Sequence, residues 1–127
     1  MKPAVLLVDH GSRRAEANEL VETLARAIRG RVDRVVHTAH LELAAPDIAA
    51  GIDACVADGA DEITVLPCFL APGRHTIEDV PAQATRAAAR HRGVTVRVAD
   101  PIGSHPLLIE LLLERLGEAE PGDGATR

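Results

Sequence analysis

The chain has 127 residues, 46% of them hydrophobic, and its formal net charge is −5 at pH 7. This length fits a single domain with a core of its own. The acidic balance, with one Phe and neither Trp nor Tyr for base stacking, argues against a nucleic-acid partner.

Apolar runs and helical stripes alternate along the chain. Strands are expected at 4–8, 33–41, 63–70 and 94–99. Helices are expected at 13–29, from Pro46 to about residue 57, from Thr76 to about residue 90, and at 105–116. The repeated strand–helix order predicts an α/β fold, a three-layer sandwich with a four-stranded parallel sheet. One domain is expected over residues 1–117, followed by a flexible tail at 118–127.

The first apolar run is too short to span a membrane, and no signal-peptide pattern precedes it. A cytoplasmic protein without a membrane partner is therefore expected. Cys55 and Cys68 lie on separate apolar segments, which favours two buried thiols over a disulfide.

Side chains suited to capping precede several of the expected helices. Ser12 is expected to cap the first helix and Ser104 the last, and Thr76 with Asp79 resembles a capping box. The last helix is apolar on almost every side over residues 107–113. Such a helix is covered on more than one side, either by a second subunit or by deep packing in its own fold.

Polar side chains follow three of the expected strands. His10 follows the first strand, Glu42 the second, and His75 the third across a short loop. The carboxyl ends of parallel strands meet at one edge of a sheet, where ligands bind in open α/β folds. Each of these residues alone has an ordinary local role in a turn or at a helix start. Together they predict a site in which imidazole nitrogens bind a metal.

Other residues on this edge suit an anionic ligand or a further ligand role. Helix N-termini at Ser12, Thr76 and Ser104 offer N–H donors, and Arg74 offers a guanidinium. His105 belongs either to the site or to the start of its own helix. His40 is either an additional ligand or a buried histidine.

Six short motifs recur in the order found in one known family. They are DHGSR at 9–13, LELA at 41–44 with Pro46, PCFL at 67–70, GRH at 73–75, EDVP at 78–81, and Gly103 followed by HPLL at 105–108. With these motifs the chain resembles the small class II chelatases, the sirohydrochlorin cobaltochelatase and ferrochelatase group. It departs from the family in having Asp9 where a small residue is usual, His40 where an aromatic residue is common, and Cys68 where an aliphatic residue is common.

The resemblance implies a chelatase-like fold of one lobe and a lyase-class enzyme. Such an enzyme inserts a divalent metal into sirohydrochlorin or a related tetrapyrrole, in cobalamin, sirohaem or porphyrin biosynthesis. It implies that His10 and His75 bind the metal and that Glu42 takes part in catalysis. Larger members carry two lobes around a cleft, so a homodimer is implied for a chain with one lobe.

The expected mechanism uses the metal as a substrate and no other cofactor. Cobalt is the first expectation, with ferrous iron or nickel as alternatives. The macrocycle's carboxylates would be held by Ser12, Arg13, Arg74, Thr76 and His105. An imidazole or the carboxylate of Glu42 would accept the two pyrrole protons. The alternatives are a metal carrier or storage module using the same histidines, and a small regulatory domain without a metal.

Overall fold

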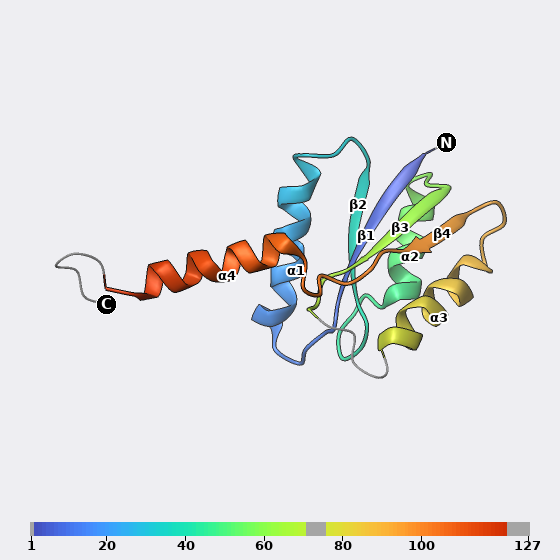
Figure 1. Ribbon diagram of the computed structural model, residues 1–127. Coiled ribbons are helices and arrows are strands. Elements are labelled where there is room, and N and C mark those ends of the chain that lie inside the picture. The colour runs from blue at the N-terminus through green and yellow to red at the C-terminus, as the bar shows by residue number, and fades with distance from the viewer. Residues whose placement is uncertain (1, 71–75, 122–127) are drawn as a thin grey trace.

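The sheet has four strands, all parallel, in the order β2-β1-β3-β4. The computed structural model describes residues 2–70 and 76–121 (Figure 1). The strands are β1 Pro3–Asp9, β2 Val35–His40, β3 Glu62–Pro67 and β4 Thr95–Val98. All four expected strands are confirmed, each within three residues of its expected ends.

Helices cover both faces of the sheet unequally. They are α1 Ala15–Arg29, α2 Ile48–Ala57, α3 Thr76–Ala88 and α4 Pro106–Ala119. On one face α1 packs against β1 and β2, and on the other α2 and α3 pack side by side, α2 against β1 and β2 and α3 against β4 (Figure 1). The expected three-layer α/β sandwich is therefore confirmed.

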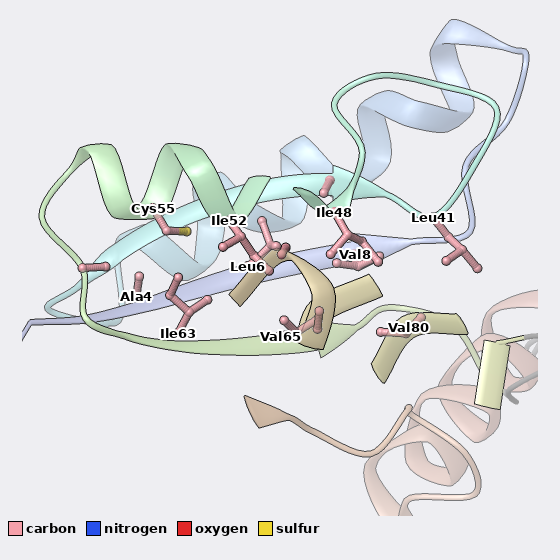
Figure 2. Packing of buried hydrophobic residues seen from close by; sticks show 14 residues of the cluster. Ala4, Leu6, Val8, Leu41, Ile48, Ile52, Cys55, Ile63, Val65 and Val80 are labelled. Carbon is pink, nitrogen blue, oxygen red and sulfur yellow. The ribbon is translucent and has the colours of Figure 1, made fainter. Parts of the chain in front are cut away.

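The core is aliphatic and lies in two layers, one on each side of the sheet. The larger layer packs Leu6, Val8 and Ile63 of the sheet against α2 and α3 (Figure 2). The smaller layer holds Val5 and Leu7 under α1. Burying a side chain of this size stabilises the fold by about 1.5–3 kcal/mol. These layers fix the positions of the carboxyl ends of the strands. The candidate site residues His10 and Glu42 come just after β1 and β2.

Two expected caps are wrong: α1 has Arg14 at its N-cap without a side-chain cap bond, and α4 is capped by His105. The Ser12 amide donates to the side chain of Asn18 at 2.9 Å, and α1 begins only at Ala15. Helix α4 begins after His105, whose ring Nδ1 accepts from the Leu107 amide at 3.1 Å.

Helix α2 likewise begins later than Pro46. Its cap is Asp47, whose carboxylate accepts from the Ala50 amide at 2.9 Å.

Helix α4 extends away from the rest of the fold (Figure 1). None of its residues is buried, and Leu107 keeps 72% of its surface exposed. The expectation that this helix packs deep in its own fold is wrong. It ends at Ala119, two residues beyond the expected domain boundary. No described helix is long and apolar enough to cross a membrane.

Both cysteines are free thiols, as expected. Burial raises the pKa of Cys55 to about 11, helped by the charge of Asp58. Burial also raises the pKa of Cys68 to about 11, helped by the charge of Asp9. Both thiols are therefore protonated at neutral pH, and neither is the thiolate that binds metals or attacks electrophiles.

The raised thiol pKa values predict a loss of stability in alkali. The unfolded chain ionises its thiols near the ordinary pKa of 9.0, while the folded chain holds them protonated up to about pH 11. The free energy of unfolding is expected to fall across this window. Urea titrations at a series of pH values should show a steeper fall in wild type than in a Cys55→Ala/Cys68→Ala variant. Equal slopes would contradict the assigned burial effect.

Candidate functional site

Backbone hydrogen bonds join the segments that follow β1 and β2. The Leu41 amide donates to the Asp9 carbonyl at 3.0 Å, and the Glu42 amide donates to the His10 carbonyl at 3.2 Å. These bonds continue the parallel pairing of the two strands past their ends. They hold the segments that follow each strand in fixed relation.

Gly11 lies where the two segments approach most closely. Its φ is +94°, in the left-handed region that favours glycine. A Cβ at this position would lie 1.8 Å from the carbonyl oxygen of Glu42. Only glycine fits, so the residue type at position 11 is dictated by the contact that brings His10 beside Glu42.

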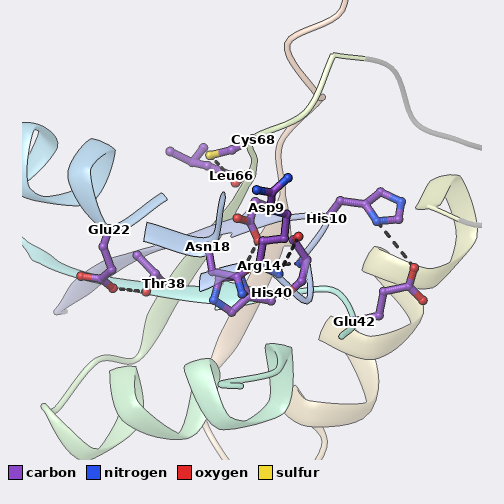
Figure 3. A network of polar contacts seen from close by, with 11 residues as sticks. Asp9, His10, Arg14, Asn18, Glu22, Thr38, His40, Glu42, Leu66 and Cys68 are labelled. Carbon is purple, nitrogen blue, oxygen red and sulfur yellow. Dashed lines mark hydrogen bonds and ion pairs between the residues drawn. The ribbon is translucent and has the colours of Figure 1, made fainter. Parts of the chain in front are cut away.

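His10 and Glu42 face each other at this edge of the sheet (Figure 3). The ring Nδ1 of His10 lies 3.6 Å from Oε1 of Glu42, and the two side chains keep 56% and 58% of their surface exposed. The imidazole also meets the ring of Phe69 edge-on, with centroids 6.3 Å apart. A solvent-accessible imidazole beside a carboxylate can bind a metal ion or move a proton. The predicted meeting of His10 and Glu42 is confirmed.

A second histidine–carboxylate pair lies at the ends of β1 and β2, with His40 buried and Asp9 half-buried. Asp9 and His40 are register neighbours on β1 and β2, and His40 Nδ1 lies 2.5 Å from Asp9 Oδ1. Their side chains keep only 6% and 18% of their surface exposed, for His40 and Asp9 respectively. His40 is thus the buried histidine of the two alternatives, and its partner is the residue directly before His10.

The buried pair is expected to stabilise the fold more than an exposed pair of the same chemistry. Removing either partner leaves the other buried without its hydrogen bond, at about 1–3 kcal/mol. We expect Asp9→Ala and His40→Ala each to cost this much, and the double variant to cost less than their sum. The matched control is the exposed pair of His37 and Asp58, whose atoms lie 2.6 Å apart, and whose coupling should stay below about 1 kcal/mol. Urea denaturation of the two double-mutant cycles measures both, and equal couplings would refute the difference.

The structure places three further residues of the expected site, Ser12, Arg13 and Thr76, near the starts of α1 and α3. Ser12 is engaged locally, since its amide bonds Asn18 and its hydroxyl accepts from the Arg14 amide at 3.0 Å. Arg13 is exposed on the same turn. Thr76 is the first residue of α3. Its side chain is not among the parts of the chain that the structure describes.

Two residues of the expected site, Arg74 and His75, lie outside the described residues. The residues before them are tied to the β4–α4 connection, because Ile102 and Gly103 donate to the carbonyls of Phe69 and Leu70 at 3.1 and 2.6 Å. Over residues 2–70 and 76–121, no three His, Cys, Asp or Glu side chains come together as a metal site.

A groove of about 530 Å³ opens beside this edge. Its lining is largely apolar and combines the end of β3 with the β4–α4 connection and the first two turns of α4. His105 and Cys68 are both among the residues that line it. Since the ring Nδ1 of His105 caps α4, its structural role is confirmed, and Nε2 is the ring nitrogen left for a ligand.

Two contacts of the site are absent from the sequence-based prediction. One is the ring of Phe69 against His10, which follows from the position of Phe69 just after β3. The other is the pairing of Asp9 with His40, which strand register could have indicated, because both residues end neighbouring strands.

Sequence and structure comparisons relate the chain to known proteins. The family model described as CbiX matches residues 4–119. The chain is 36% identical over 113 residues to the sirohydrochlorin ferrochelatase, chloroplastic, of Arabidopsis thaliana, covering 88% of this chain and 50% of that protein. It is 36% identical over 118 residues to the sirohydrochlorin cobaltochelatase of Priestia megaterium, covering 91% of this chain and 38% of that protein.

A solved structure of similar length shares the fold. The crystal structure of a cobalamin (vitamin B12) biosynthesis CbiX protein from Marinobacter aquaeolei VT8 superposes with a TM-score of 0.79 at 36% identity, covering 91% of this chain and 95% of that one. The two curated relatives are different in size, since the chain spans half or less of their length. With a family model matched over nearly its whole length, the chain belongs to the CbiX family.

Proposed function

We propose that this protein inserts a divalent metal, cobalt or ferrous iron, into sirohydrochlorin or a related tetrapyrrole, as a chelatase of the lyase class. The observation that carries the proposal is the exposed His10–Glu42 pair at the carboxyl edge of a parallel sheet. The names of the two curated relatives, one a ferrochelatase and one a cobaltochelatase, support the substrate and both metals. The product would serve cobalamin or sirohaem biosynthesis.

His10 is the proposed metal ligand within the described residues. Its imidazole is solvent-accessible, and the Nδ1 side faces Glu42. Neutral imidazole suits cobalt, ferrous iron and nickel alike, so the residue type does not choose among them. His75 is the proposed second ligand, five residues beyond Leu70 and directly before α3.

Glu42 is the proposed proton acceptor. Two pyrrole protons must leave the macrocycle as the metal enters, and a carboxylate beside the bound metal can accept them one at a time. Its backbone is fixed by the bond from the Glu42 amide to the His10 carbonyl. Glu42 can therefore act without a large movement of the loop that carries it.

The proposed contacts to the substrate's carboxylates come from Ser12, Arg13, Arg74, Thr76 and His105. Arg13 is exposed and adjacent to the His10 turn, so its guanidinium can reach an anionic group there. His105 lines the groove of about 530 Å³.

We also propose that the working form is a homodimer in which two lobes enclose the macrocycle. The chain spans half or less of the curated chelatases that it matches. A single lobe leaves the His10–Glu42 pair more than half exposed. Metal insertion requires a bent, largely desolvated macrocycle, and a second lobe over this edge would provide the missing wall.

The experiment is incubation of the pure protein with sirohydrochlorin and Co²⁺, Fe²⁺ or Ni²⁺, followed by the absorbance spectrum of the macrocycle. A rate above that of metal and substrate alone supports the proposal, and the ranking of the three rates identifies the preferred metal. Metal bound in equilibrium dialysis without any accelerated insertion would instead indicate a carrier.

A further inference from the structure

The relative position of His10 and Glu42 depends on the backbone that carries them. Both side chains are more than half exposed, and His10 Nδ1 lies 3.6 Å from Glu42 Oε1, which is longer than a hydrogen bond. Neither residue belongs to a core layer. Their separation is therefore set by the segments that follow β1 and β2.

The segment that carries Glu42 has a backbone that its surroundings must hold in place. Leu43, the next residue, has φ +70°, in the left-handed region that residues other than glycine rarely adopt. Such a conformation persists only where the surrounding structure fixes it. One fixing contact is the bond from the His40 amide to the Pro46 carbonyl at 2.8 Å, which closes the loop at 41–46 onto the end of β2.

The side chain of His40 joins this loop to the turn that carries His10. Its ring Nδ1 donates to the Asp9 carboxylate at 2.5 Å, across the last register pair of β1 and β2 (Figure 3). A Cβ on Gly11 would lie 3.3 Å from the Cβ of His40, so the turn also packs against this side chain. His40 thus contacts both segments of the site.

The opposite end of the His10 turn is held by α1. The Ser12 amide donates to Oδ1 of Asn18 at 2.9 Å, and Nδ2 of Asn18 donates to the Ser12 carbonyl at 2.7 Å. With this end fixed, the remaining freedom of His10 lies at the strand end, where Asp9 immediately precedes it.

A polar pair largely removed from water is a costly way to hold two strand ends together. The side chains of His40 and Asp9 keep only 6% and 18% of their surface exposed. Replacing such a pair by apolar side chains of similar volume is often neutral or stabilising, because both polar partners lose their hydration on burial. A hydrogen bond supplies what an apolar contact lacks, a fixed distance and direction between two atoms. The pair therefore suits a positioning role better than a purely stabilising one.

We infer that Asp9 and His40 are positioning residues that set the separation and orientation of His10 and Glu42. They act through the backbone, since His10 directly follows Asp9 and Glu42 comes two residues after His40. This inference rests on the proposed function, because the His10–Glu42 pair is the proposed site of metal insertion. Losing the pair should slow turnover more than it weakens substrate binding, because other residues are proposed to hold the macrocycle.

The test replaces the pair by apolar side chains of similar volume, in the double variant Asp9→Val/His40→Leu. We expect urea denaturation to give a free energy of unfolding near the wild-type value. We expect kcat for insertion of Co²⁺ into sirohydrochlorin to fall about 10-fold, with KM for the macrocycle changing less than about twofold. Asp9→Asn keeps an oxygen that accepts from His40 and should retain most of the wild-type kcat. The matched control, Asp58→Val/His37→Leu, removes the exposed pair of the same chemistry and should leave kcat unchanged.

A second readout does not require metal insertion. The His10 ring meets Phe69 edge-on, so the ring current of Phe69 shifts the imidazole proton resonances of His10. These resonances, assigned by their loss in His10→Ala, should move in the Asp9→Val/His40→Leu variant. They should stay in place in Asp9→Asn and in the control. If the double variant does not fold, Asp9→Ala alone breaks the same bond and gives the same two readouts.

The outcomes separate this inference from the proposed function. Unchanged His10 resonances in the folded double variant would overturn the inference, whether or not the wild-type protein inserts metal. A wild-type kcat in that variant would overturn it as well, and so would an equal loss of kcat in Asp9→Asn. A wild-type protein that inserts no metal would overturn the proposed function, and the resonances would still decide whether Asp9 and His40 position His10.

Discussion

Replacing His10 by alanine is expected to lower the rate of metal insertion by roughly 100-fold or more, the range for a group that acts at the reacting atoms. The side chain is exposed and belongs to neither core layer. Its removal should therefore leave the free energy of unfolding close to the wild-type value. The initial rate of the absorbance change with sirohydrochlorin and Co²⁺ measures the loss.

His91→Ala is the matched control for this variant. His91 also pairs with a carboxylate, its Nε2 lying 2.7 Å from Asp53, but it lies before β4 at the opposite edge of the sheet. Its loss should leave the insertion rate unchanged. A His10→Ala variant that inserts metal as fast as His91→Ala would contradict the assigned role of His10.

Glu42→Gln separates the proton acceptor from the metal ligand. It keeps the shape of the side chain and removes its charge, so metal binding by His10 should persist while insertion slows. Equilibrium dialysis with Co²⁺ and the initial insertion rate give the two readouts. If Glu42→Gln inserted metal at the wild-type rate, another group would have to accept the protons.

Gly11→Ala is expected to destabilise the fold by more than about 3 kcal/mol, because it combines a left-handed backbone with a collision. The new Cβ would lie 1.8 Å from the backbone oxygen of Glu42, and a backbone atom cannot swing aside as a flexible side chain can. Either the His10 turn or the segment carrying Glu42 must move. We expect urea denaturation to show the loss of stability and absorbance to show a loss of insertion in any folded fraction.

Gly93→Ala provides the control for the backbone term alone. Gly93 has φ +80°, similar to Gly11, but a Cβ there would meet nothing within 4 Å. The left-handed conformation by itself costs about 1–2 kcal/mol. Equal losses for Gly11→Ala and Gly93→Ala would show that the contact between Gly11 and Glu42 has no energetic effect.

The strands and the meeting of His10 with Glu42 could be predicted because one rule governs both. Buried parallel strands read as continuous apolar runs, and their carboxyl ends converge at one edge. The helix starts were harder, because several polar residues near each start can serve as the cap. Asn18, reaching back to Ser12 from within α1, leaves no simple sequence signal.

Helix α4 marks another limit of the sequence. Its leucines predict a helix that is covered on more than one side, but within this chain the helix stays exposed, and a pattern of apolar residues does not state what would cover it. The direction in which α4 leaves the fold is three-dimensional information, set by the hydrogen-bonded connection before His105. The pairing of Asp9 with His40 likewise depends on register between strands far apart in the sequence.

The initial rate of metal insertion into sirohydrochlorin, with and without the wild-type protein at equal Co²⁺, tests the central claim most directly. We expect a rate above the spontaneous one that is proportional to protein concentration, with each protein molecule completing more than one insertion. A rate equal to that of metal and macrocycle alone, from folded protein, would contradict it.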